Sequence, residues 1–352
     1  MTTPSEIRIA RLPDGPLTAE HFGVYEAALP GHLPDNSVLL RNACFGVNAG
    51  MRSRIGAAPV SSARSSHQAP PSKSYAGLLG VGDVPQSDAV AQVLESTAAA
   101  FQPGDWVVHI APWRSRDVVA AHQLRRVEVT DQTPPELYLT ALGHTAFTAY
   151  VGMVEVGHVG AQDTVYVSAA AGGVGSYAVQ IARLCGARVI GSAGSADKRA
   201  YLSEVLKLDA AFDYKQTPVA DALADFAPQG LSLYYDNVGG EQLEAAIGAL
   251  GDHGRVVLCG MVSRYAQPHT APGPRNLNLF IQRRLSMQGF TVLEHEYARP
   301  AFEACMRHWM DRGEVVVRST VLQGLGALPE AFVRMLQGAT VGRALVRIDA
   351  ET

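Results

Sequence analysis

The sequence predicts an α/β protein with two domains. A β-rich domain is expected over residues 1–132, completed by residues 301–352, and a doubly wound parallel-sheet domain over residues 133–300. The chain has 352 residues, which is more than one hydrophobic core usually supports. Its first part contains short apolar runs broken by turn residues, whereas its central part alternates strand-like runs with helical spacing.

The N-terminal domain is predicted from short β-like runs such as Ser37–Arg41 and Trp106–His109. Gly, Pro and Asp separate these runs, a pattern typical of a mainly antiparallel, barrel-like module. Residues 56–77 are rich in Ser, Ala and Pro and offer no periodic apolar face. We therefore expect a long surface loop there, either a lid or a disordered segment.

Charge and composition narrow the classes of partner. A formal net charge of −4 gives no broad electrostatic reason to bind nucleic acid or anionic membranes. No apolar run approaches the roughly 20 residues of a membrane helix, and the first residues lack a secretory signal pattern. The cysteines, Cys44, Cys185, Cys259 and Cys305, form no CxxC pair, which favours reduced thiols. We therefore expect a cytoplasmic protein with no nucleic-acid or membrane partner.

The segment 163–202 has the pattern of a strand, a glycine-rich turn, a helix and a second strand. The turn occupies residues 172–175, and Ala170 stands in the place of the first glycine of the usual fingerprint. Such a turn lets the backbone approach a pyrophosphate, and the helix N-terminus offers free N–H groups to that anion. The complete βαβ context favours a dinucleotide site over a structural tight turn in an unrelated domain.

The end of the second strand indicates which dinucleotide binds. An NAD site places an Asp or Glu here, which binds the 2′-hydroxyl of the ribose. This chain instead has small residues followed by Ser195, Lys198 and Arg199, which supply donors and positive charge for a 2′-phosphate. Asp197 is the nearest carboxylate, but it lies past the strand end. The pattern favours NADP(H) over NAD(H), and a solvated helix face is the alternative for Lys198 or Arg199.

Three stretches carry a family resemblance: AAAGGVGSYAVQIARLCGARVIGSAGSADKRAYL at 169–202, YYDNVGGEQLEAAIGAL at 234–250 and GRVVLCGMVSRY at 254–265. They resemble the zinc-independent medium-chain dehydrogenases/reductases, in the branch of leukotriene B4 12-hydroxydehydrogenase, prostaglandin reductase and 2-alkenal double-bond reductase. The resemblance implies a GroES-like domain, closed by the C-terminal segment, and a Rossmann domain that binds NADP(H). It also implies an active site between the domains and a homodimer.

The resemblance assigns the cofactor contacts along the chain. It places the pyrophosphate on the glycine-rich turn and the 2′-phosphate near the end of the second strand. Later strand ends would line the nicotinamide, and one residue near the C-terminus stands where relatives carry a cofactor-binding Asn. The predicted cofactor-binding residues are Gly172, Gly173, Val174, Gly175, Ser195, Lys198, Tyr214, Asn237, Cys259, Gly260, Ser263, Tyr265, Phe290, Thr291, Val292 and Thr340.

Tyr265 is the predicted catalytic residue. Reduction of a double bond conjugated to a carbonyl begins with hydride delivery to the β-carbon, and negative charge then builds on the carbonyl oxygen. A phenol suits this oxygen because it donates a hydrogen bond and stays protonated at neutral pH. The proton for the α-carbon comes from Tyr265 or from water. The alternative is a tyrosine that only lines the cleft by packing.

A catalytic zinc, as in alcohol dehydrogenases of the same architecture, needs three protein ligands and an open position. Cys44 and His67 have a spacing near that of the zinc-containing relatives, and His144 is a conceivable third ligand. His67, however, lies in the Ser- and Pro-rich loop, and no cysteine occupies the region of the third ligand. We therefore predict no metal, with Cys44 as a small buried apolar residue.

Two segments depart from the family pattern on the substrate side. Asn48-Ala49-Gly50 precedes Met51, where relatives usually carry Asp-Pro-Tyr, and His144-Thr145-Ala146 replaces Met-Pro-Gly. Asn48, Met51 and His144 are therefore substrate-side candidates, and a hydrogen-bonded structural role is the alternative for His144. These changes leave the identity of the substrate open.

We therefore expect an NADPH-dependent reductase of the C=C bond in an α,β-unsaturated carbonyl or related conjugated acceptor. The alternatives are a biosynthetic reductase of secondary metabolism, whose enolate or iminium cyclises or is trapped, a quinone reductase, and a non-catalytic NADPH-binding protein. By family analogy the strand near residues 285–290 lies at the sheet edge, where pairing with a second copy would build a homodimer.

Overall fold

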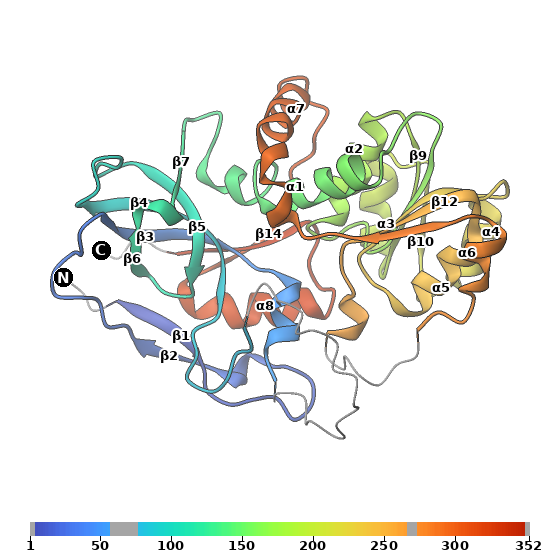
Figure 1. Cartoon of the computed structure of the whole chain (residues 1–352). Helices are drawn as coiled ribbons and strands as arrows, with labels where there is room; N and C mark the ends of the chain where they lie inside the picture. The colour runs from blue at the N-terminus through green and yellow to red at the C-terminus, as the bar shows by residue number, and fades with distance from the viewer. Residues whose placement is uncertain (1–3, 57–76, 266–272, 349–352) are drawn as a thin grey trace. The chain divides into compact units, whose positions relative to one another are not determined.

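The computed structural model describes residues 4–56, 77–265 and 273–348. The chain divides into two compact units (Figure 1). Unit 1 comprises residues 1–128, 322–335 and 346–352, and unit 2 comprises residues 129–321 and 336–345. Within the described ranges, no helix is both long and apolar enough to cross a membrane.

Antiparallel strands dominate unit 1, as the short apolar runs of its sequence predict. β1 (Ser5–Ile9) pairs with β2 (Phe22–Glu26) in a small two-stranded sheet. The larger sheet has the order β14-β15-β3-β4-β5-β7, with β6 paired to β3. Its strands in unit 1 are β3 (Ser37–Gly46), β4 (Gln86–Ser96), β5 (Trp106–Pro112), β6 (Arg116–Ala120) and β7 (Arg125–Val127). The other two strands, β14 (Ser319–Gln323) and β15 (Arg343–Arg347), are divided between the units, because residues 319–321 and 343–345 belong to unit 2.

The core of unit 1 forms because alternate strand residues are apolar and point to the same face. Val38 of β3 and Val107 of β5 belong to one buried cluster. A second anchor comes from α8 (Leu328–Leu336), whose Phe332 ring lies 6.0 Å from the ring of Trp113, centre to centre. Burial of a side chain of this size contributes about 1.5–3 kcal/mol, so the aromatic contact holds α8 on unit 1.

Unit 2 contains a six-stranded sheet in which every pairing is parallel. Its order is β10-β9-β8-β11-β12-β13, so the order reverses between β8 and β11. In this doubly wound topology, ligands bind at the carboxyl ends of the strands beside the reversal. The strands are β8 (Thr164–Val167), β9 (Arg188–Ala193), β10 (Ala210–Asp213), β11 (Leu231–Asp236), β12 (Leu250–Leu258) and β13 (Ser286–Gly289).

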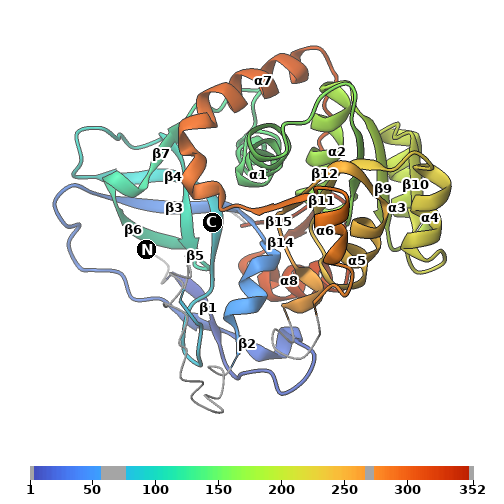
Figure 2. The ribbon, with the colours of Figure 1, turned by 45° about the vertical axis from the view of Figure 1, so that its right-hand side comes forward.

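Helices cover both faces of this sheet, with α1 and α2 on one face and α5 and α6 on the other (Figure 2). The helices of unit 2 are α1 (His144–Tyr150, continued by the π-helical turn Val151–Val156), α2 (Gly175–Leu184), α3 (Ala196–Ala200, continued by the π-helical turn Tyr201–Val205), α4 (Val219–Phe226), α5 (Gly240–Ala249), α6 (Asn278–Gln282) and α7 (Arg299–Asp311). Short 3-10 helices cover Ala19–His21, Ala49–Arg54, Ala121–Gln123, Pro135–Leu139, Val262–Arg264, Val292–Ala298 and Leu325–Ala327.

The predicted fold class is confirmed in both parts of the chain: unit 1 is β-rich and mainly antiparallel, and unit 2 is a doubly wound parallel sheet. The C-terminal segment divides differently from the expected bounds, because residues 301–321 and 336–345 belong to unit 2. The ring of Phe302 in α7 lies 5.2 Å from that of Phe147 in α1, which holds α7 on unit 2. Residues 57–76 of the predicted loop lie outside the described residues.

Candidate functional site

The glycine-rich turn joins β8 to α2 and surrounds the N-terminus of that helix. Gly175 is required there, because a Cβ atom on it would lie 2.3 Å from the carbonyl oxygen of Ala169. Ala169 has a φ angle of 49°, a left-handed conformation that tightens the turn. The N–H groups of residues 176–178 already donate to the carbonyl oxygens of Gly172 and Val174 at 2.9–3.1 Å, so the N–H groups at residues 173–175 are the ones that suit an anion. The turn therefore has the geometry that a pyrophosphate needs.

Three residues predicted near the 2′-phosphate meet at the carboxyl end of β9. Ser195 caps α3, where its Oγ accepts a hydrogen bond from the N–H of Lys198 at 3.4 Å. The hydroxyl of Tyr214, just after β10, would lie 2.8 Å from a Cβ atom on Gly194. Lys198 is half-buried, whereas Arg199 is exposed. The solvated-face interpretation therefore fits Arg199, and Lys198 belongs to the cluster.

A second lysine reinforces this cluster. Burial lowers the pKa of Lys198, and the nearby charge of Lys215 lowers it further. Two neighbouring ammonium groups create a positive potential that suits a phosphate. Lys215 is not among the residues predicted from the sequence, although it directly follows Tyr214 in the chain.

The segment 338–343 forms another side of the glycine-rich turn. The N–H of Gly342 donates to the carbonyl oxygen of Ala171 at 2.8 Å, next to a parallel bridge with Gly172. Near the start of the segment, the carbonyl oxygen of Gly338 accepts a hydrogen bond from Lys198 Nζ at 2.7 Å. Thr340, predicted as a cofactor contact, is buried in this segment. The segment therefore links the pyrophosphate turn to the lysine cluster.

Arg343 is a further cation that the sequence argument did not select. It is 3% exposed, and its Cδ lies 3.5 Å from the position of a Cβ atom on Gly173. Its N–H donates to the carbonyl oxygen of Arg318 at 3.0 Å, which fixes the backbone beside the turn. A guanidinium in this place suits the charge of a pyrophosphate. No local pattern could have found it, since its neighbours lie far earlier in the chain.

The carboxyl ends of β11 and β12 bring together the residues predicted for the nicotinamide side. The N–H of Gly260 donates to the carbonyl oxygen of Asp236 at 3.0 Å. Ser263 donates through Oγ to the carbonyl oxygen of Val238 at 2.5 Å. Asn237 lies between Asp236 and Val238, the two residues whose carbonyl oxygens accept these hydrogen bonds. The two strand ends thus form one hydrogen-bonded unit.

Tyr265 and Cys259 belong to the same strand-end region. The hydroxyl of Tyr265 accepts a hydrogen bond from the N–H of Met261 at 3.3 Å and would lie 3.2 Å from a Cβ atom on Gly260. Burial raises the pKa of Cys259 to about 12, so it remains a neutral thiol. The structure therefore places the predicted catalytic phenol beside the predicted nicotinamide wall.

The other predicted wall follows the edge strand β13. The Cζ atom of Phe290 would lie 3.0 Å from a Cβ atom on Gly152, so its ring packs against the π-helical turn after α1. Val292 is buried, and Thr291 is the N-cap residue of the next 3-10 helix. Phe290 and Val292 therefore pack within unit 2, and the contact of all three residues with the nicotinamide stays a prediction.

The substrate-side candidates lie in different units. In unit 1, Asn48 donates through Nδ2 to Asp88 Oδ1 at 2.7 Å, and Met51 is buried. In unit 2, His144 begins α1, is half-buried, and accepts a hydrogen bond on its carbonyl oxygen from Thr148 Oγ1 at 2.8 Å. The contacts of Asn48 and Met51 therefore lie within unit 1 and that of His144 within unit 2, and their contact with a substrate stays a prediction.

The residues considered for zinc do not form a described cluster. Cys44 is 2% exposed within β3, as expected for a small buried side chain, and His67 lies outside the described residues. Among residues 4–56, 77–265 and 273–348, no group of three His, Cys, Asp or Glu residues is arranged to hold a metal ion.

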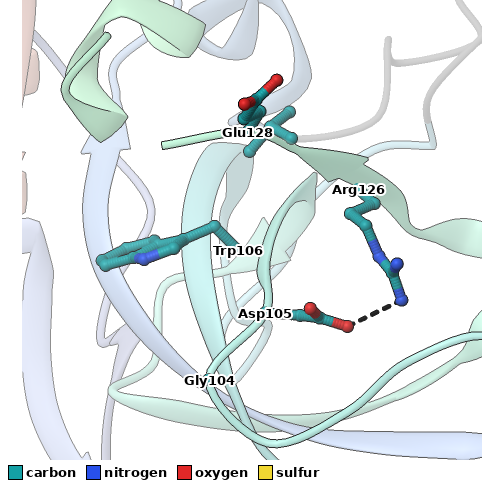
Figure 3. A pocket seen from close by; sticks show the side chains of 6 residues that line it. Gly104, Asp105, Trp106, Arg126 and Glu128 are labelled. Carbon is teal, nitrogen blue, oxygen red and sulfur yellow. Dashed lines mark ion pairs between the residues drawn. The ribbon is translucent and has the colours of Figure 1, made fainter. Parts of the chain in front are cut away.

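Two hollows lie in unit 1, and none of the predicted cofactor residues line them. One, of about 460 Å³, is lined by Gly104, Asp105, Trp106, Arg126, Val127 and Glu128 (Figure 3). Two of its charged groups pair with each other, because Arg126 contacts Asp105 at 2.7 Å. The other, of about 590 Å³, lies beside β5 and β6. Neither of these two hollows therefore coincides with the candidate site at the strand ends of unit 2.

Two family models match the chain. The model described as N-terminal domain of oxidoreductase matches residues 5–127, and the model described as zinc-binding dehydrogenase matches residues 173–317. The matched ranges follow the division into a β-rich part and a doubly wound part.

Whole-length relatives agree with these models. The chain is 31% identical to NADPH-dependent curcumin reductase of Escherichia coli K12, over 97% of this chain and 95% of that protein. It is 36% identical to mouse prostaglandin reductase 1, over 76% of this chain and 83% of that protein. The crystal structure of CurA from Vibrio vulnificus in complex with NADPH is 30% identical, with a TM-score of 0.88, and the match covers 99% of this chain and 100% of that one. The chain therefore belongs to the zinc-independent, NADP-dependent oxidoreductases of the medium-chain dehydrogenase/reductase family.

Proposed function

We propose that the protein reduces the C=C bond of an α,β-unsaturated carbonyl compound, or of a related conjugated acceptor, with NADPH as the reductant. The observation that carries the proposal is that three features belong to unit 2: a tight glycine-rich turn at a helix N-terminus, a lysine cluster after β9, and Tyr265 after β12. The names of the relatives, NADPH-dependent curcumin reductase and prostaglandin reductase 1, support the same class of reaction.

The cofactor is NADP(H), and the residues of unit 2 fit it. A Cβ atom on Gly175 would lie 2.3 Å from the carbonyl oxygen of Ala169, so only glycine permits the tight turn whose backbone would approach the pyrophosphate. No carboxylate occurs at residues 191–196 to bind an unphosphorylated ribose. Lys198 and Lys215 would bind the 2′-phosphate, and the turn would bind the pyrophosphate. When bound, NADPH supplies the hydride.

Tyr265 acts on the substrate in this proposal. Its phenol oxygen accepts a hydrogen bond from Met261, and a phenol oxygen that accepts from an N–H still carries a proton to donate. Donation to the substrate carbonyl oxygen stabilises the negative charge that builds there when the β-carbon is reduced. The structure supports this function by placing the hydroxyl beside Gly260, at the end of β12.

The test is NADPH oxidation, followed by the loss of near-ultraviolet absorbance, with a panel of enals, enones and quinones and with NADH in parallel. We expect turnover of enals or enones with NADPH, and products that mass spectrometry shows to have gained two hydrogen atoms. Tyr265→Phe should lower kcat about 100-fold and leave NADP⁺ affinity near that of the wild type. Equal turnover by mutant and wild type would remove Tyr265 from the mechanism.

The other outcomes point to specific alternatives. A cyclised or trapped product would indicate the biosynthetic reductase, for which the altered residues Asn48 and His144 are the motivation. Turnover of quinones without enals would indicate a quinone reductase. Tight NADPH binding without turnover of any acceptor would favour a non-catalytic NADPH-binding protein.

We also propose a homodimer formed along β13. This strand pairs with β12 on one side, forms the edge of the six-stranded sheet in the described part of the chain, and is exposed throughout. Ile281 of α6 is 84% exposed and Met287 of β13 is 42% exposed, so apolar surface accompanies the open edge. A second copy would pair both. Light scattering should give twice the chain mass, and Gln288→Pro should give a monomer; a monomeric wild type refutes the dimer.

A further inference from the structure

A buried polar cluster lies at the carboxyl ends of β8 and β11, the strands on either side of the reversal in sheet order. Ser168 follows β8, and Tyr234 and Asp236 end β11; all three side chains are 0% exposed. The N–H of Ser168 donates to the carbonyl oxygen of Tyr235 at 3.3 Å, which continues the pairing of the two strands. Burial of polar groups costs free energy unless they are hydrogen-bonded, so the partners of these three side chains indicate what the cluster does.

Asp236 organises the turn that follows β11. Its Oδ1 accepts hydrogen bonds from the N–H groups of Val238 at 2.8 Å and Gly239 at 2.7 Å, and from the hydroxyl of Tyr234 at 2.7 Å. Gly239 has a φ angle of 72°, which a side chain would strain. The carboxylate therefore holds the backbone on both sides of Asn237.

Asn237 has its amide orientation set by Ser168. Its Nδ2 lies 2.8 Å from the carbonyl oxygen of Ser168, and its N–H donates to Ser168 Oγ at 3.0 Å. A carbonyl oxygen only accepts hydrogen bonds, so the amide nitrogen must be the atom that faces it. The side-chain oxygen of Asn237 is then directed away from Ser168, as an acceptor.

We infer that Asp236 is a positioning residue, which acts through Ser168 and the Val238–Gly239 turn to hold Asn237 with its side-chain oxygen toward an N–H or O–H donor of the nicotinamide half of NADP(H). The inference rests on the proposed function only in that NADP(H) is the cofactor, and it does not depend on which acceptor is reduced. Asp236 itself touches neither cofactor nor substrate. Its ionised carboxylate keeps an acceptor in front of both turn N–H groups.

The charge state of Asp236 gives this function a signature. Burial raises the pKa of Asp236, while hydrogen bonds from Gly239, Tyr234 and Val238 oppose the shift. Oδ2 has no hydrogen-bond partner among the described residues. The other titratable groups that interact with Asp236 have raised pKa values and stay neutral: Tyr234, Tyr166 and Cys259. Protonation of Asp236 removes the anion that accepts from the turn, so cofactor affinity should fall on the acid side.

The sharpest test compares two stacked tyrosines. Tyr234 and Tyr166 lie on neighbouring strands with ring centres 4.9 Å apart. The hydroxyl of Tyr166 makes its hydrogen bonds with Ser192 Oγ and Gln242 Oε1, both at 2.9 Å, whereas the hydroxyl of Tyr234 donates directly to Asp236. Tyr234→Phe and Tyr166→Phe therefore each remove one buried hydroxyl from the same stack, and Tyr166→Phe is the matched control.

The measurement is the dissociation constant of NADP⁺ by calorimetry as a function of pH, without substrate. We call the fall in NADP⁺ affinity at low pH the acid limb. Tyr234→Phe removes a donor that lowers the pKa of Asp236, so in this variant the acid limb should move to higher pH by about one unit. Tyr166→Phe should leave the limb in place, and both should lose similar thermal stability. Asp236→Asn should remove the part of the acid limb that Asp236 contributes, because an amide does not titrate.

The 2′-phosphate of NADP⁺ also takes up a proton at about pH 6, and this contribution is common to all variants. Equal acid limbs in both Phe variants would overturn the inference, as would an acid limb in Asp236→Asn identical to that of the wild type. If Tyr234→Phe does not fold, Ser168→Ala and Ser192→Ala form a second pair, because only Ser168 contacts Asn237. In that pair only Ser168→Ala should weaken NADP⁺ binding, by about tenfold; equal affinities would overturn the inference. Since no acceptor is present, a failed reductase assay leaves these results unaffected.

Discussion

The two units bury polar side chains in different ways. In unit 1, His109 Nε2 contacts Asn42 Oδ1 at 2.9 Å, Asn42 donates to the carbonyl oxygen of Arg114 at 2.8 Å, and Trp113 donates to Ser87 Oγ at 2.9 Å. These bonds stay among antiparallel strands and their connections. In unit 2, the hydrogen bonds of Ser168 and Asp236 end at the turn of residues 237–239, which follows the parallel strand β11. Buried polarity therefore stabilises the first unit, whereas in the second it orients a residue at the strand ends.

Burial has opposite effects on the pKa values of the two clusters. It lowers the pKa of His109 to about 4 and raises the pKa of Asp236. The physical cause is the same, because a low-dielectric interior disfavours the charged form of both groups. For His109 the consequence is a loss of stability in acid, and for Asp236 the consequence we propose is a loss of cofactor affinity.

The largest expected effect lies in the glycine-rich turn of unit 2. Gly175→Ala places a Cβ atom 2.3 Å from the carbonyl oxygen of Ala169, so the turn must move. We expect NADP⁺ affinity to fall more than about 100-fold, because more than one hydrogen bond to the charged pyrophosphate is lost and each contributes about 1.5–3 kcal/mol. Calorimetry measures the loss. Gly160→Ala is the control, since nothing lies within 4 Å of its Cβ position. Equal NADP⁺ binding by both variants would contradict the function of the glycine-rich turn in binding the pyrophosphate.

The next effect concerns the choice of cofactor. Lys198→Ala should weaken NADP⁺ binding about 10- to 100-fold, the range for a hydrogen bond to a charged group, and leave NAD⁺ binding nearly unchanged. Arg199→Ala is the matched control, because Arg199 is exposed. The ratio of the two dissociation constants is the measurement. A loss of equal size for NADP⁺ and NAD⁺ would show that Lys198 acts on the fold and not on the 2′-phosphate.

A smaller effect is expected in unit 1. The pKa of His109 falls from its ordinary value of 6.5 to about 4, so the folded state favours the neutral ring. Its contribution to stability is complete above pH 6.5 and is lost as the pH falls toward 4, by up to about 1.4 kcal/mol per unit. His109→Gln, which can still donate to Asn42, should flatten this acid dependence.

Tryptophan fluorescence during urea unfolding can follow the effect, because Trp106 and Trp113 belong to unit 1 and Trp309 to unit 2. NADP⁺ affinity should be the same in His109→Gln and the wild type. A change in affinity would break the contrast between the two clusters, and an unchanged acid dependence would remove His109 from the stability of unit 1.

Much of the cofactor side was predictable because its signals are local. The βαβ pattern at 163–202 predicts a turn that the structure places at a helix N-terminus. Ser195 and Lys198 follow from the same pattern, whereas Tyr214 was expected only from the family resemblance. The structure brings the three residues together after β9, and their contacts with the cofactor stay predictions. The functions of Tyr265 and His144 stay predictions. Their surroundings depend on contacts that no local pattern encodes.

The sequence by itself determined the strand–turn–helix units and the absence of a carboxylate after the second strand of the parallel sheet. Both are short-range properties, set by glycine geometry and by side-chain chemistry within a few residues. Only the tertiary structure decided that Lys198 contacts Gly338, that Gly342 pairs beside Gly172, and that Asp236 lies next to Ser168. Strand pairing brings these residues together over long stretches of chain, and the order of parallel strands is a global outcome of packing.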